Sequence, residues 1–344
     1  MIKSIFLFGL IASAVLLQGC TKKETIVETT PVGDPFVVRA DQYSLRHYFV
    51  DTSYMRLYEA YYQAPGTPVA DPQERIYECE VWIQRPDSEF SPYDRSGVAW
   101  INLPHRPPAG YGSSYRTTTE IPGTVETARF YQMPWYGLEA DGYVGVVSLY
   151  LDPLSDVTIG IAYRRGDGTQ AGDFVNDVSN TSTPLVLKLL KPRDLFTNGP
   201  QYRVAWQMLL KNIYFVHLGS LVRYGFQLDI LRRNATIGYE TSIQGHPFLQ
   251  VLGLDRYAVD NTPRPDGDGQ FDFRPGITLN KDFGEIIFPS LRPFDTGIRR
   301  YFVERGLPLP DSTYFCPEIY DATQAVARQS ARNRYSLQGR AISD

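Results

Sequence analysis

Three aspartates spaced by glycine form the part of the sequence best suited to hold a cation. Asp266, Asp268 and Asp272 lie in the run Asp-Asn-Thr-Pro-Arg-Pro-Asp-Gly-Asp-Gly-Gln-Phe-Asp over residues 260–272. Hard cations such as Ca²⁺ take several oxygen ligands from a sharply turning loop, and the first two aspartates match the start of such a loop. Three later positions, the fifth, sixth and twelfth, depart from it: Gln270, Phe271 and Ile277. The run predicts either a calcium site or a Gly/Asp turn between two elements.

Cys20 is the second residue with a distinctive chemistry. Lys3 precedes an apolar run, Ile5–Leu17, which is shorter than the roughly 20 residues that a bilayer-spanning helix needs. The run ends in Leu-Gln-Gly-Cys, a pattern typical of a lipoprotein signal peptide. We therefore expect a signal peptide over 1–19, a covalent diacylglycerol lipid on Cys20 and a polar, flexible tether over 20–35. Thr21, rather than Asp, follows Cys20, which favours an outer-membrane location in either leaflet.

Two further cysteines, Cys79 and Cys316, form an even pair in a compartment that permits disulfides. They predict either a disulfide bond or two buried free thiols. Cys79 lies in a strand-like run, and Cys316 lies in a loop beside proline.

Aromatic residues gather in two stretches. Tyr131, Trp135 and Tyr136 form a candidate binding patch, and four tyrosines lie within residues 54–62. Aromatic platforms stack on sugars or form the centre of protein interfaces. The alternative is that these side chains pack the core of the protein.

Motifs of the common enzyme classes are absent from the sequence. It contains no Gly-x-Ser-x-Gly, His-Glu-x-x-His, phosphate-binding loop or Cys-x-x-Cys. The four histidines are not at ligand spacing, and the net charge of -4 argues against a nucleic-acid partner. A hydrolase with a carboxylate pair stays an alternative, because such a pair depends on a separation in space.

The elements expected to position these residues are mostly strands. Strand patterns and apolar runs cover, in order, 77–83, 98–103, 144–151, 157–163, 185–190, 226–230, 277–279 and 285–288. Helices are expected over 204–214, 246–254 and, nearest the C-terminus, 320–333. Many strands without regular βαβ alternation predict a mainly β fold: an antiparallel, jelly-roll-like β-sandwich with a few short helices and a C-terminal helix. Residues 36–344 would form one domain, divisible into two packed subdomains near 192–202.

Thirteen short runs follow one another in an order that matches a known family. They are 80–83, 99–103, 151–163, 172–174, 187–190, 209–214, 226–230, 249–256, 265–276, 284–289, 292–294, 320–323 and 333–339. Over about 260 residues the chain resembles the repeated N-terminal-type soluble domain of the SprA (Sov) family, the outer-membrane translocon of type IX secretion and gliding motility. The resemblance implies a non-enzymatic protein without a required cofactor. It also favours the turn interpretation of the aspartate run, since a similar run recurs in the family.

Two departures limit what the resemblance implies. Members of the family are several times longer, and they are not normally lipidated, whereas this chain has Cys20. We therefore expect a stand-alone lipoprotein, not the pore itself. It would act by protein–protein contact in protein transport or gliding, on a SprA-like outer-membrane barrel or another component of that machinery. The alternative is a surface carbohydrate-binding β-sandwich lipoprotein.

Overall fold

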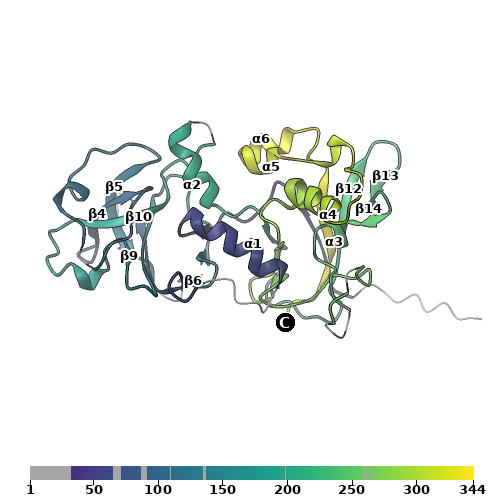
Figure 1. Cartoon of the computed structure of the whole chain (residues 1–344), viewed down its shortest axis with the longest axis horizontal. Helices are drawn as coiled ribbons and strands as arrows, with labels where there is room; N and C mark the ends of the chain where they lie inside the picture. The colour runs from purple at the N-terminus through teal and green to yellow at the C-terminus, as the bar shows by residue number, and fades with distance from the viewer. Residues whose placement is uncertain are drawn as a thin grey trace, which may run out of the picture. The chain divides into compact units, whose positions relative to one another are not determined.

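The computed structural model describes residues 32–64, 71–86, 91–108, 110–134, 137–197, 199–258, 260, 262–264 and 266–344. The expected signal peptide, Cys20 and most of the tether lie outside these residues. Val32–Asp344 forms one compact unit of strands and short helices (Figure 1). Within it, no described helix has the length and apolar character needed to cross a bilayer.

Five strands between residues 76 and 191 close into a small barrel, in the order β10-β4-β5-β3-β8 and back to β10. The β10–β4 pair is parallel, with Leu185 opposite Gly97, and the other four pairs are antiparallel. Every residue of β10 is buried, which explains its uninterrupted apolar run. The strands are β3 (Ile76–Gln84), β4 (Arg95–Trp100), β5 (Val125–Gln132), β8 (Ile159–Arg165) and β10 (Leu185–Lys191), with β9 (Gln170–Ala171) beside β8.

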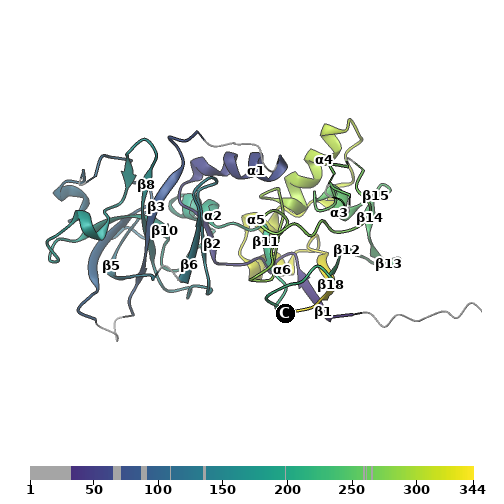
Figure 2. The ribbon, with the colours of Figure 1, turned by 90° about the horizontal axis from the view of Figure 1, so that it is seen from below.

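A four-stranded antiparallel sheet, here called sheet A, joins the first described strand to the last. Its order is β1 (Asp34–Arg39), β18 (Tyr335–Ala341), β12 (Gln227–Asn234) and β13 (Gly238–Glu240). Asp34 pairs with Ala341, so β1 and β18 are neighbours over their whole length (Figure 2). Alternate residues of β1 and β12 are buried, so one face of sheet A meets the core and the other faces solvent.

Three smaller sheets complete the strands. One contains β2 (His47–Phe49), β7 (Val146–Leu149) and β6 (Leu138–Asp141), and a second contains β11 (Ile213–Phe215), β17 (Glu285–Ile287) and β16 (Leu279–Asn280). The third is the hairpin of β14 (Ser242–Ile243) and β15 (His246–Pro247). β16 and β17 pair antiparallel and overlap the strand runs expected at 277–279 and 285–288.

The helices are short. They are α1 (Met55–Gln63), α2 (Arg203–Met208), α3 (Phe248–Val251), α4 (Ile298–Glu304), α5 (Glu318–Asp321) and α6 (Gln324–Gln329). Shorter helical turns are η1 (Thr52–Tyr54), η2 (Ser113–Tyr115), η4 (Val175–Asp177), η5 (Pro200–Tyr202), η6 (Pro293–Gly297) and η7 (Ser312–Tyr314). Helix α1 and the turn before it are bonded to two distant parts of the chain: Tyr54 Oη of η1 donates to Glu74 O, and Tyr58 Oη of α1 donates to Phe288 O.

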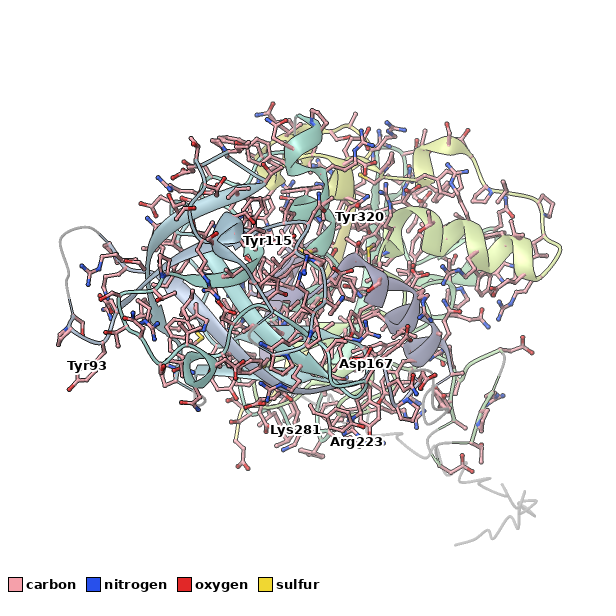
Figure 3. The ribbon with its side chains drawn as sticks, turned by 60° about the vertical axis from the view of Figure 1, so that its left-hand side comes forward. Tyr93, Tyr115, Asp167, Arg223, Lys281 and Tyr320 are labelled. Carbon is pink, nitrogen blue, oxygen red and sulfur yellow. The ribbon has the colours of Figure 1, made fainter. Side chains whose placement is uncertain are left out.

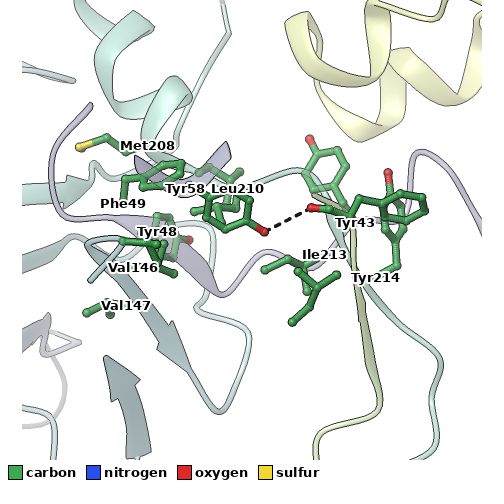
Figure 4. Packing of buried hydrophobic residues seen from close by; sticks show 14 of the residues in the cluster. Tyr43, Tyr48, Phe49, Tyr58, Val146, Val147, Met208, Leu210, Ile213 and Tyr214 are labelled. Carbon is green, nitrogen blue, oxygen red and sulfur yellow. Dashed lines mark hydrogen bonds between the residues drawn. The ribbon is translucent and has the colours of Figure 1, made fainter. Parts of the chain in front are cut away.

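One large hydrophobic cluster runs through the barrel, the small sheets and sheet A. It includes Tyr43, Tyr48, Phe49, Met208 and Leu210, part of the region drawn in Figure 4. Residues 192–202 connect β10 to α2, where a subdomain boundary was expected, and buried residues on both sides belong to the same cluster.

The mainly β class is confirmed, with 32% strand against 19% helix. The finer expectation of a jelly-roll-like sandwich differs from the structure, which closes five strands into a barrel and places sheet A separately. The cause is the parallel β10–β4 pairing, which joins residues almost 90 positions apart. Such a non-local contact leaves no trace in local hydrophobic patterns.

The expected C-terminal helix over 320–333 is corrected to two short helices, and the last element is strand β18. Ala322 is extended (φ -129°, ψ 164°), which ends α5. Thr323 then begins α6 because its side chain accepts the Val326 N–H, as at many helix N-termini. The helix expected over 204–214 ends at Met208, because Ile213–Phe215 pairs with β17 instead.

Candidate functional site

The aspartate run forms a tight loop organised by a residue outside it, Asp255. The Asp255 carboxylate is buried and accepts the backbone N–H groups of Asp268 (2.8 Å) and Gly269 (2.9 Å). Gly267 has φ +64°, and a Cβ atom there would lie 2.3 Å from the Asp255 carboxylate. The loop therefore needs glycine at 267 for both conformation and space.

The three predicted ligands make different contacts. Asp272 accepts the Arg256 N–H at 2.7 Å, and burial raises the pKa of Asp272 to about 6. Asp268 accepts the Gln270 N–H at 3.0 Å, and Asp266 is exposed. Over the part of the chain that the structure describes, no group of three or more His, Cys, Asp or Glu side chains is arranged to hold a metal ion. The calcium site stays a prediction, while the hydrogen bonds account for these residues as a turn.

Cys79 and Cys316 are free cysteines in the structure. Cys79 lies half-buried in β3, and Cys316 lies buried just before α5. Burial raises the pKa of Cys79 to about 11 and that of Cys316 to about 12. Both are therefore protonated and poorly reactive at neutral pH.

The proposed aromatic patch is represented by Tyr131 alone, because Trp135 and Tyr136 lie outside the described residues. Tyr131 lies in β5 with the Arg85 guanidinium 4.4 Å from its ring centre. In the second stretch, Tyr54, Tyr58 and Tyr62 are buried core residues. The core interpretation therefore holds for these three tyrosines.

Two hollows flank Trp206 of α2 and form the candidate binding site, here called the Trp206 hollows. The larger has a volume of about 530 Å³, the smaller about 370 Å³, and Trp206 and Leu209 line both. Other residues of the larger hollow include Phe49, Met55, Arg203, Gln207, Leu210, Lys211, Leu291, Arg292, Tyr320 and Asp321. Those of the smaller are Tyr43, Leu45, Tyr48, Pro153, Ser155, Lys191, Leu195, Thr323, Gln324 and Ala325.

Trp206 is held by contacts on two sides. Its Nε1–H donates to Tyr320 O at 2.6 Å, and the Lys211 ammonium lies 4.3 Å from the ring centre. Tyr320, whose carbonyl accepts this bond, is a buried residue and is labelled in Figure 3, where the 87% exposed Tyr93 is labelled for contrast. The indole is thus fixed in place while it still lines both hollows.

Lys211 is a buried lysine at the end of α2. Its Nζ donates to Trp206 O at 2.5 Å and to Leu209 O at 2.9 Å. Burial, aided by the charge of Arg292, lowers the pKa of Lys211 to about 7. The geometry indicates a side chain that caps the carbonyl end of the helix.

An ion-pair group closes the other side of the larger hollow. Arg292 binds Asp321 through two hydrogen bonds of 2.7 and 2.8 Å, and its Nε donates to Asp295. The guanidinium also lies 4.9 Å from the Tyr320 ring centre. Two parallel hydrogen bonds fix the planar group, so this rim is ordered before any partner binds.

The smaller hollow is more apolar and contains one unusual hydroxyl. Tyr43 is only 2% exposed, and its Oη is a buried atom without a hydrogen-bond partner in the described part of the chain. Lys191 also lines this hollow, and its Nζ donates to Ser155 O and Val157 O. Burial lowers the pKa of Lys191 to about 8. Because the Tyr43 hydroxyl is itself buried, a ligand group entering the hollow would meet mainly apolar walls.

The hollows combine residue types that are common in protein interfaces. Tryptophan, tyrosine and arginine are enriched where interfaces are strongest, and an apolar centre with a polar rim is the usual plan. Sequence reasoning missed Trp206, Tyr43 and Arg292, whose positions come together only in the fold. Only Lys211 could have been noticed in the sequence, because it is a single cationic residue within the largely apolar run Leu209–Tyr214.

Comparison with known proteins adds no name to this site, since no family model and no curated protein matches the chain.

Proposed function

We propose that this chain is a non-enzymatic, lipid-anchored outer-membrane protein that acts by protein–protein contact in type IX secretion or gliding motility. Its partner would be a SprA-like outer-membrane barrel or another component of that machinery. The Trp206 hollows would receive side chains of the partner. The lipid on Cys20 would hold the protein at the membrane and raise its effective concentration there.

One observation supports this proposal most. Four of the sequence runs that resemble the SprA family each contribute residues to the Trp206 hollows: 151–163, 209–214, 292–294 and 320–323. The last two also contact each other: Phe294 N donates to Tyr320 Oη at 2.9 Å, and Arg292 binds Asp321. Runs that are far apart in the sequence thus build one surface feature, as expected if the resemblance reflects a shared binding region.

The test is affinity purification of the tagged protein from outer membranes in mild detergent, with two arginine variants on the same helix. Ala325 lines the smaller hollow, and the next residue, Val326, is 58% exposed and does not line it. We expect the wild type and Val326→Arg to recover a SprA-like barrel or its companions in near-equal amounts. Ala325→Arg should lower that recovery about tenfold or more, because it fills an anchor pocket.

Two results would contradict the proposal. Recovery of the wild-type protein alone would exclude a stable complex, and equal recovery with both variants would exclude the hollows as the contact. A glycan array tests the carbohydrate-binding alternative. Sugar binding that is lost in Trp135→Ala or Tyr136→Ala, but kept in Ala325→Arg, would support that alternative.

A further inference from the structure

The solvent face of sheet A is rich in arginine. The register places Arg39, Ser336 and Leu231 in one row across β1, β18 and β12, and Val37, Gln338 and Asp229 in the next. Arg233 follows on β12, opposite Tyr239 of β13. The alternating residues Val38, Leu337 and Ile230 are buried. All four strands therefore contribute to one exposed face.

A groove of about 640 Å³ crosses this face. Three arginines, Arg39, Arg233 and Arg334, line it, and none of its lining residues is acidic. The nearest carboxylates leave an excess of positive charge. Asp41 is buried and binds Arg39, and Asp229 is one exposed acid on the same face. The groove is thus complementary to an anionic surface.

Two of these arginines are neighbours without an acidic partner. Arg233 N donates to Arg334 O at 2.9 Å, so Arg233 of β12 lies beside the residue that immediately precedes β18. The structure shows no ion pair of either guanidinium with a described residue. Like charges at adjacent cross-strand positions are destabilising. An external anion bound between them would remove that cost.

The rest of the face suits a membrane surface better than a small anion. Val37 is 60% exposed and Tyr239 is 57% exposed, and both line the groove. Tyrosine is favoured at the head-group level of bilayers. Strand β1 begins fourteen residues after Cys20, a length of chain that reaches at most about 50 Å. A lipid on Cys20 would therefore keep this face within reach of the bilayer.

We propose that the solvent face of sheet A binds the anionic phospholipid head groups of the membrane that carries the anchor. Arg39, Arg233 and Arg334 would contact the phosphates, and Tyr239 and Val37 would enter the head-group layer. The proposal rests on the proposed lipid anchoring, to which it adds a fixed orientation of the protein. It does not involve the Trp206 hollows, so the two can fail separately.

The test uses residues 32–344, which carry their own continuous core and lack both the signal peptide and the lipid. Sedimentation with phosphatidylcholine vesicles is compared with sedimentation with vesicles containing roughly one third phosphatidylglycerol. We expect binding to the anionic vesicles only, and weaker binding at high salt. Arg233→Gln/Arg334→Gln should weaken binding about tenfold or more, since each cation near an anionic surface strengthens it roughly fivefold.

The matched control is Arg264→Gln/Lys281→Gln, which removes the same charge at exposed residues outside the groove and should leave binding nearly unchanged. Circular dichroism and thermal unfolding verify that both variants fold. Equal losses in the two variants would overturn the proposal, as would equal binding to neutral vesicles. Binding to an acidic polyglutamate peptide but not to anionic vesicles would also overturn it and identify the groove as a protein contact.

Discussion

His47 Nε2 lies 2.8 Å from Glu285 Oε1, and this buried contact ties β2 to β17. Arg46 binds the same oxygen at 2.7 Å, and His47 Nδ1 lies 2.8 Å from Ser148 Oγ. Burial alone would raise the pKa of Glu285. The hydrogen bond from His47 and the charges of His47 and Arg46 outweigh burial and hold that pKa below its usual value.

Glu285→Gln should therefore lower the free energy of unfolding at pH 7 by about 3 kcal/mol, because it leaves the largely buried Arg46 guanidinium without its carboxylate. The contribution of Glu285 is complete above its unfolded pKa, about 4.3, and is lost as pH falls through the lower folded value. The difference between variant and wild type should thus shrink in acid. Urea unfolding at a series of pH values measures it. Glu304→Gln, at an exposed position of α4, is the control, and an equal effect of both would refute the role of the contact.

Whereas Glu285 makes the free energy of unfolding depend on pH in acid, Lys211 should do so above neutrality. Its folded pKa of about 7 lies below the unfolded value of about 10.4, so the folded chain binds fewer protons between them. Stability should rise with pH in that window by up to about 1.4 kcal/mol per unit. Lys211→Met should remove this rise, whereas Lys281→Met, at a half-exposed lysine, should keep it. A slope that is the same in both variants would mean that Lys211 remains charged in the folded protein.

The raised pKa of Asp272 leads to a prediction about the effect of pH and of calcium on the stability of the protein. Its pKa is raised to about 6 above an unfolded value of about 3.9, so stability should fall as pH rises from about 4 to 6. Asp272→Asn should raise the free energy of unfolding at pH 7.5 by about 1 kcal/mol, a value reduced for partial solvation. The exposed Asp266→Asn should not. We expect Ca²⁺ to leave Tm unchanged, and a Ca²⁺-dependent rise that Asp272→Asn abolishes would instead support a calcium site.

Two glycines of the same loop separate the effect of conformation from that of space. Gly267 and Gly269 both have positive φ, +64° and +83°, but only at Gly267 would a Cβ atom meet the Asp255 carboxylate. Gly269→Ala should destabilise by about 1 kcal/mol, and Gly267→Ala by about 3 kcal/mol, because strain and a clash add. Thermal unfolding of both variants provides the comparison. Equal costs would show that the loop moves to accept the methyl group.

Local patterns in the sequence predicted several strands well. The apolar run 185–190 lies in β10, which is buried on both faces, so all of its residues are apolar or buried. The alternating residues 226–230 lie in and beside β12, which is buried on one face, so every second residue is apolar. Periodicity failed where a cap or a pairing partner decided the outcome. Within the expected helix 320–333, the side chain of Thr323 caps the start of a separate helix, α6. Within the expected helix 204–214, Ile213 instead pairs with Ile287 of β17 and lies in a strand.

The candidate site was less predictable than the strands. Tyr43, Trp206 and Arg292 are separated by at least 86 positions, and they line the two hollows only because distant segments pack around α2. The aspartate loop was visible because its residues are contiguous. Its organiser, Asp255, was missed because a single buried carboxylate outside the run carries no local signature.

The pairing of β1 with β18 also determines which part of the fold resists a force applied to the N-terminal end of the described chain. Tension along the chain from residues before Val32 acts first on β1, an edge strand that is bonded to the sheet only through β18 among the described strands. Because the Asp34–Ala341 pair lies at the loaded end, pulling across the sheet would peel the ladder one pair at a time. Pulling along the strand would instead load all six pairs in shear at once. The resistance of the protein to traction should therefore depend on the direction of the pull.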